Sequence, residues 1–278
     1  MGAARTVLPE ALDHLPADDP QAIHSRRDLQ RIHRWMGTRS TLLQAWHRLM
    51  PAAAPAGRLQ SGPARPDPLR LRLRVLELGA GDGSLMLGLA GQLAPAWGQV
   101  DLTLLDRQAL VSSATLAAYA RLGWRATAWT HDALDWADGP ASSTVAAAPG
   151  WDLIVANLFL HHFEAAALRA LLGAVATQAQ RFIAIEPRRA GLALWASRAV
   201  GLIGANAVTR EDAKLSVRAG FCGRELSAAW PATAPAWQLD EGRAGLFSHR
   251  LVGRAARGSA GLPGVPGAPG ALANGGAG

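Results

Sequence analysis

The sequence predicts an α/β protein built on a doubly wound, mostly parallel sheet. Between residues 70 and 252, short apolar runs alternate with longer amphipathic runs, the pattern of strands joined by crossover helices. Hydrophobic residues make up 49% of the 278-residue chain, which is enough to bury one main core. We therefore expect a single α/β core with appendages.

Five apolar runs of strand length supply the expected parallel strands. Their ranges are 71–78, 100–105, 125–129, 152–156 and 181–186. After residue 186 the alternation changes, and two further strand-like segments follow at 224–229 and 246–252. These two segments predict an antiparallel hairpin that closes one edge of the sheet.

The segments outside the core differ in composition. Residues 1–50 predict an N-terminal helical cap, with two short helices separated at Gly37. Residues 51–69 contain five prolines and predict a linker. The core domain is expected at 70–252. Residues 253–278 are mostly glycine, alanine and proline, which predicts a disordered tail.

Charge and cysteine content narrow the function classes. The net charge is +7, but the basic residues, all arginine except Lys214, are scattered, which argues against a nucleic-acid partner. Cys222 is the only cysteine, so we expect no disulfide within the chain, no metal site and a cytoplasmic location. The apolar stretch 192–205 is broken by Arg198 and is too short to span a membrane. Oligomeric state is left open.

The most informative segment is a glycine loop that follows the first expected strand. Residues 77–83 are Glu-Leu-Gly-Ala-Gly-Asp-Gly, and glycines in such a loop let a ligand approach the backbone. A dinucleotide fingerprint would place its third glycine where Ser84 stands. The Glu77 carboxylate suits a cationic group better than a pyrophosphate, and the amino group of S-adenosylmethionine is one. The alternative is a tight turn that binds nothing.

Polar residues follow the next three strands. Asp106 ends the second strand, where a carboxylate can accept both ribose hydroxyls, although it could equally cap the following helix. Asp132 follows the third strand and could accept from an adenine amino group, or be a solvated loop residue. Asn157 ends the fourth strand, where ligands bind in open α/β sheets. These residues would face one crevice.

In this order, the glycine loop, Asp106, Asp132 and Asn157 resemble the motifs of class I S-adenosylmethionine-dependent methyltransferases over roughly residues 70–252. The triplet Leu160-His161-His162 resembles the corresponding motif of one branch of this family, which includes the ubiquinone and menaquinone C-methyltransferases and many natural-product methyltransferases. The resemblance implies a Rossmann-like methyltransferase fold. It also implies S-adenosylmethionine as cofactor, with its amine near Glu77 and Asn157, its ribose on Asp106 and its adenine near Asp132. The implied cofactor-binding residues are Glu77, Gly79, Ala80, Gly81, Gly83, Asp106, Arg107, Asp132, Ala133 and Asn157.

Four residues are candidates for contact with an acceptor. His161 or His162 could take a proton from a hydroxyl, although either could instead cap or pack locally. Arg188 could hold an acceptor carboxylate or form a surface ion pair. Trp35 could stack on an aromatic acceptor or belong to the core. We also expect the cap and residues 192–205 to roof the crevice.

The function predicted is methyl transfer to a small molecule, such as a phenolic, quinol or polyketide-like compound. An RNA or protein methyltransferase is the alternative within the fold, opposed by the missing basic block and by Asn157-Leu-Phe-Leu where an Asn-Pro-Pro-Tyr tetrad would stand. A non-catalytic module that binds S-adenosylmethionine is the alternative outside catalysis. A nicotinamide dehydrogenase is disfavoured by Ser84 and by the lack of a Tyr-x-x-x-Lys pair. The acceptor, and whether oxygen, carbon or nitrogen is methylated, are left open.

Overall fold

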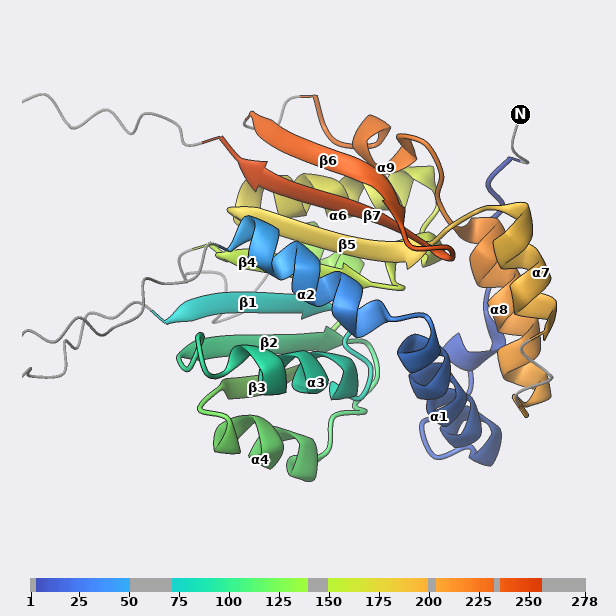
Figure 1. Cartoon of the computed structure of the whole chain (residues 1–278), viewed down its shortest axis with the longest axis horizontal. Helices are drawn as coiled ribbons and strands as arrows, with labels where there is room; N and C mark the ends of the chain where they lie inside the picture. The colour runs from blue at the N-terminus through green and yellow to red at the C-terminus, as the bar shows by residue number, and fades with distance from the viewer. Residues whose placement is uncertain (1–3, 51–71, 140–149, 200–203, 233–235, 257–278) are drawn as a thin grey trace, which may run out of the picture.

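A computed structural model describes residues 4–50, 72–139, 150–199, 204–232 and 236–256 (Figure 1). One seven-stranded sheet has the order β3-β2-β1-β4-β5-β7-β6. Its first five strands are mutually parallel, and the last two form an antiparallel hairpin. The strands are β1 (Leu73–Leu78), β2 (Val100–Asp106), β3 (Arg125–Thr130), β4 (Leu153–Asn157), β5 (Arg181–Pro187), β6 (Trp237–Ala244) and β7 (Ser248–Ala255). The predicted fold class is confirmed.

Helices cover both faces of the sheet. One core cluster joins α2, α3 and α4 to the sheet, and a second joins α5, α6 and α9 to its other face. Val75 and Leu76, neighbours on β1, belong to opposite clusters, because successive side chains of a strand point to opposite faces. The helical elements are η1 (Ala11–Asp13), α1 (Pro20–Trp35), α2 (Thr38–Leu49), α3 (Ser84–Leu93), α4 (Ser113–Arg121), α5 (Ala133–Ala137), η2 (Leu160–His162), α6 (Ala165–Gln178), α7 (Gly191–Ala199), α8 (Ala207–Ala219) and α9 (Glu225–Ala228).

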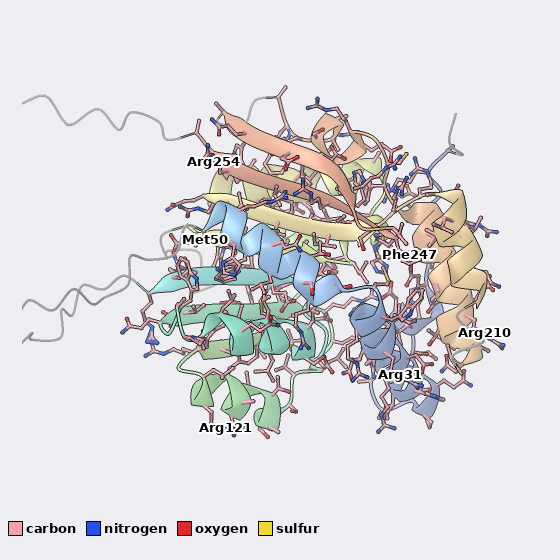
Figure 2. All side chains as sticks on the ribbon, viewed as in Figure 1. Arg31, Met50, Arg121, Arg210, Phe247 and Arg254 are labelled. Atoms are coloured by element: carbon pink, nitrogen blue, oxygen red, sulfur yellow. The ribbon has the colours of Figure 1, made fainter. Side chains whose placement is uncertain are left out.

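The two helices that were expected to form one cap, α1 and α2, pack in different parts of the structure. Figure 1 shows α1, α7 and α8 grouped beyond the carboxyl ends of the parallel strands, whereas α2 lies across the sheet. Trp46 and Leu42 of α2 are fully buried. Met50, directly after the helix and labelled in Figure 2, is buried as well. Helical spacing shows that a helix has an apolar face but does not identify the surface it covers. So α2 is a core helix, and α1 alone of the two faces the crevice.

The chain differs from its sequence prediction at the last strands. The segment expected as a strand at 224–229 forms the short helix α9, and the partner of β7 is β6. Glu241 of β6 accepts hydrogen bonds from the backbone N–H groups of Leu226 and Ser227 at the start of α9. A short apolar run does not distinguish a strand from a buried helical turn. Residues 253–255, expected in the tail, extend β7. The linker and residues 257–278 lie outside the described residues.

We expect Trp46→Ala to lower the free energy of unfolding by about 3–5 kcal/mol, because removing a buried tryptophan leaves a large cavity. Trp46 is 0% exposed and contacts Trp97 and Trp124. Urea denaturation followed by circular dichroism measures the change. The matched control is Trp35→Ala, at a side chain 71% exposed, which should change stability by less than about 0.5 kcal/mol. Equal effects of the two substitutions would contradict the core position of α2.

Candidate active site

A pocket of about 590 Å³ lies at the carboxyl ends of the parallel strands. Because β1 pairs with β2 on one side and β4 on the other, the strand order reverses there, and open α/β sheets bind ligands at such a point. The pocket is lined by the loops after β1, β2, β3 and β4, by α1 and by residues 7–14. The loops at the sheet edge, which the sequence predicted to form a crevice, therefore make one wall of the pocket. The N-terminal residues and α1 make the opposite wall.

The glycine loop turns sharply from β1 into α3. Gly79 and Gly81 have φ angles of 68° and 57°, a region that favours glycine. A Cβ atom on Gly79 would lie 2.3 Å from the Phe159 ring, whereas one on Gly81 would have no atom within 4 Å. The Asp106 carboxylate accepts a hydrogen bond of 2.8 Å from Gly81 N and holds the loop in place. The backbone at Gly81 is thus open to a ligand.

Glu77, at the end of β1, carries an unusual carboxylate. It is 2% exposed, and its Oε2 atom is buried with no hydrogen-bond partner among the described residues. Burial, together with the charges of Asp106 and Asp82, raises the pKa of Glu77 to about 8. The amide oxygen of Asn157, on the adjacent strand β4, is also buried and unpartnered. Two orphaned acceptors in one pocket indicate a missing donor, because buried polar atoms are normally paired.

The other predicted cofactor residues are spread along the same edge. Asp106 accepts from Gly81 N and from Gln108 N, the latter at 2.9 Å, and both of its oxygens retain further acceptor capacity. Asp132 caps α5 by accepting from Leu134 N at 2.7 Å. The predicted residues that line the pocket are Glu77, Gly79, Ala80, Gly81, Asp106, Arg107, Asp132, Ala133 and Asn157. Gly83 lies behind the loop, where Tyr119 donates to its carbonyl oxygen.

Glu186 organises the loop that follows β4. Its carboxylate, fully buried, accepts from the backbone N–H groups of Phe159 and Leu160 and from the ring Nδ1 of His161 at 2.9 Å. In this loop Leu158 has a φ of 50°, the only positive φ of a non-glycine residue in the described parts of the chain. Such backbone persists where the surroundings fix it. Glu186 therefore positions His161. Glu186 is not among the residues that line the pocket.

The two histidines both line the pocket and differ in environment. Burial opposes a charge on His161, but the carboxylates of Glu10 and Glu186 outweigh it and raise the pKa of His161 to about 9. Without a competing ligand the ring is thus protonated at neutral pH and is not ready to accept a proton. His162 is less buried, and its Nδ1 lies 3.0 Å from Asp13 Oδ2.

Residues 4–14, here called the N-terminal strap, close the outer side of the pocket. Arg5 donates to the carbonyl oxygens of His161 and Phe163 at 3.0 and 2.8 Å. The Asp212 carboxylate of α8 accepts from the backbone of Ala11 and Leu12. Through these contacts the strap is docked on η2 and α8. Sequence patterns gave no signal for it, because it has no apolar periodicity.

Two predicted acceptor residues are not brought to the pocket. Trp35 is exposed and stacks on Phe247, with ring centroids 5.4 Å apart. Phe247, labelled in Figure 2, lies in the turn between β6 and β7. Arg188 pairs its backbone with Phe221 and Phe247. Position after a strand does not set the direction of a long side chain, which explains the difference. The α1 residues Gln30 and His33 line the pocket instead.

No protein-family model and no curated protein matches the chain. Among solved structures, magnesium protoporphyrin IX methyltransferase from Synechocystis PCC 6803, with bound S-adenosylhomocysteine, has a TM-score of 0.46 at 13% identity, covering 88% of this chain and 91% of that one. An O-methyltransferase assigned in Nostoc punctiforme PCC 73102 has a TM-score of 0.48 at 13% identity, covering 88% and 64%. Mitomycin 7-O-methyltransferase has a TM-score of 0.48 at 18% identity, covering 88% and 60%. In the described residues, no helix is long and apolar enough to cross a membrane.

Proposed function

We propose that the protein transfers a methyl group from S-adenosylmethionine to a small-molecule acceptor. The observation that carries the proposal is the buried, unpartnered carboxylate oxygen of Glu77 beside a glycine loop with open backbone. An ammonium group is the ligand that such a carboxylate lacks, and the cofactor carries one on its methionine portion. A pyrophosphate would bring negative charge towards Glu77, Asp82 and Asp106.

The other pocket residues fit the remaining parts of this cofactor. Asn157 could accept a second hydrogen bond from the ammonium group. The free acceptor capacity of Asp106 suits the two ribose hydroxyls, and Asp132 with Ala133 lies where the adenine would follow. The carboxylates of Asp106 and Asp132 are already held by backbone N–H groups, so they need little reordering when a ligand binds.

Transfer itself is an in-line displacement that needs alignment and exclusion of water. An acceptor atom attacks the methyl carbon, the carbon–sulfur bond breaks with its electron pair remaining on sulfur, and the acceptor gives up a proton. The strap and α1 cover the pocket, which supports an enclosed reaction. The histidine pair lies in the wall that would meet an acceptor oxygen. A phenolic, quinol or polyketide-like acceptor, and a cytoplasmic location, are part of this proposal.

We expect Asp106→Ala to weaken S-adenosylmethionine binding by about 1.5–3 kcal/mol, because hydrogen bonds to a charged acceptor in a partly desolvated site are lost. Isothermal titration calorimetry with S-adenosylmethionine, and with NADH as the competing cofactor, measures this directly. Asp135→Ala, at an exposed residue outside the pocket, is the matched control. Binding of NADH, or unchanged affinity of a folded Asp106→Ala variant, would contradict the proposal.

A further inference from the structure

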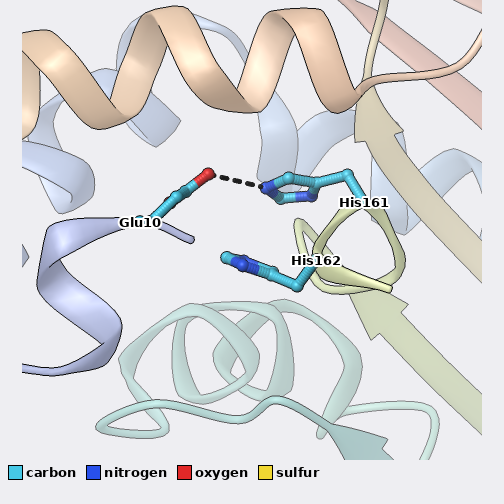
Figure 3. A group of neighbouring side chains, drawn as sticks. All are labelled: Glu10, His161 and His162. Carbon is cyan, nitrogen blue, oxygen red and sulfur yellow. Dashed lines mark ion pairs between the residues drawn. The ribbon is translucent and has the colours of Figure 1, made fainter. Parts of the chain in front are cut away.

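One wall of the pocket holds a cluster of side chains that the proposed cofactor binding does not use. Glu10, on the strap, faces His161 and His162, on η2 (Figure 3). One potential ligand atom from each residue lies within 4.8 Å of the others. His161 Nε2 lies 3.4 Å from Glu10 Oε1, and Figure 3 marks this pair. The cluster joins Glu10 to residues 151 and 152 positions later in the sequence, and all three residues line the pocket.

The second observation is the state of the His161 ring. Its Nδ1 is 2.9 Å from the Glu186 carboxylate, which leaves Nε2 facing the cluster. This Nε2 atom is buried and makes no hydrogen bond within the described parts of the chain; its charged neighbour is Glu10 Oε1, at the ion-pair distance of 3.4 Å. An imidazole held at one nitrogen by a carboxylate, with its other nitrogen facing further ligand atoms, has the arrangement of a metal-binding histidine and its supporting carboxylate.

His162 repeats this arrangement. Its Nδ1 lies 3.0 Å from Asp13 Oδ2, which leaves its Nε2 as the available ligand. Glu186 and Asp13 would thus each support one histidine from behind, and Glu10 would supply the third ligand. Together with Glu10 they give three carboxylates around two imidazoles, a charge balance that favours a divalent cation.

The distance between His161 Nε2 and Glu10 Oε1 agrees with coordination of one ion by both residues. Two ligands about 2.0–2.1 Å from a tetrahedral metal lie about 3.4 Å apart, as His161 Nε2 and Glu10 Oε1 do. Two imidazoles and one carboxylate suit a first-row transition metal better than Mg²⁺ or Ca²⁺, which prefer oxygen ligands. We propose that Glu10, His161 and His162 bind one divalent transition-metal ion on the wall of the pocket. The sequence predicted no metal site, because the third ligand comes from the strap.

Three protein ligands leave a metal able to accept a further ligand, and here the open side is the pocket. The next inference rests on the proposed function: an acceptor hydroxyl or phenol would bind the ion through its oxygen and release its proton to solvent water more readily, since a metal lowers the pKa of a bound oxygen acid. The strap would then complete the acceptor site by supplying Glu10.

The test uses the full chain, freed of metal by a chelator, and titrates it with Zn²⁺ by calorimetry and with Co²⁺ by visible absorption. We expect one equivalent of each to bind, with Co²⁺ bands typical of mixed nitrogen and oxygen ligands. Glu10→Gln and His162→Gln should each weaken Zn²⁺ binding at least about 10-fold, and Asp13→Asn about 10-fold through its support of His162. His47→Gln, at an exposed histidine of α2, is the control and should bind as the parent does.

Circular dichroism and thermal unfolding check that each variant is folded. No Zn²⁺ binding, binding that Glu10→Gln and His162→Gln leave unchanged, or Mg²⁺ binding of equal affinity would overturn the metal site. A parent protein that binds Zn²⁺ as expected but not S-adenosylmethionine would retain the metal site and disprove the proposed function. The two hypotheses therefore fail separately.

Discussion

Glu77→Gln is expected to weaken S-adenosylmethionine binding at least about 100-fold, because it removes the buried charge that pairs with the cofactor's ammonium group. The same substitution should stabilise the unliganded protein. In the absence of a ligand, Glu77 is a buried acid beside Asp106 and Asp82, with one oxygen atom lacking a partner. A buried acid that lowers the stability of the unliganded protein and is paired only when a cation binds is typical of a functional site.

The sign of the pH dependence follows from the raised pKa. Between the ordinary value of 4.5 and about 8, the folded protein keeps a proton on Glu77 that the unfolded chain has released. The free energy of unfolding therefore falls as pH rises through this window and levels off above it. Glu77→Gln should remove this dependence and raise the free energy of unfolding at pH 8 by on the order of 2–4 kcal/mol.

Cofactor binding should show the complementary dependence. Since the ammonium group pairs with an ionised carboxylate, binding below pH 8 must release the proton from Glu77, and affinity should fall as pH falls. Calorimetry in buffers of different ionisation enthalpy measures that proton release. Glu164→Gln, at an exposed carboxylate that lines the same pocket, is the matched control. A Glu77→Gln variant that binds the cofactor normally would disprove the pairing.

The sheet could be predicted from the sequence because burial on both faces makes each parallel strand a short, continuous apolar run. Leu153 to Ala156 is such a run, and Val75 to Leu78 is one except for Glu77. Polar residues at or directly after the strand ends had to lie at the carboxyl edge, so Glu77, Asp106 and Asn157 could be placed there from the sequence. The position of helix α2 was harder to predict, since the spacing of its apolar residues fits a helix that covers the pocket as well as a core helix.

The outer side of the pocket could not be predicted, because long-range polar contacts hold it. Arg5, Glu10 and Asp13 reach the site through single hydrogen bonds and ion pairs to η2 and to Arg107. Such contacts have no period along the chain. His161 was recognised from its local motif, but its charge state depends on Glu10 and Glu186, which lie on other segments.

The strap gives the second large prediction, for a variant that lacks residues 1–14. Methyl transfer should fall at least about 100-fold, because an uncovered pocket admits water and loses the alignment of donor and acceptor. S-adenosylmethionine should dissociate about 10-fold faster, since Arg107 loses its contacts with Asp13 and one wall of the pocket is gone. Folding should survive, because η1 contains no buried residue and the two core clusters begin at α2.

Point variants separate loss of the cover from loss of strap side chains. Asp212 does not line the pocket, but it holds the strap through the backbone of Ala11 and Leu12. Asp212→Asn should therefore weaken the docking of the strap without changing a pocket side chain. It should increase the cofactor dissociation rate and lower transfer in the same direction as the deletion, but less. Glu211→Gln, its exposed neighbour, pairs only with Lys214 among the described residues and should change neither rate. A longer truncation that begins at residue 69 could not be used to test the cover, because it would also remove the buried Trp46 from the core. If the chain without residues 1–14 methylates its acceptor at the parental rate, the strap does not cover the reaction, and enclosure must come from α1 alone.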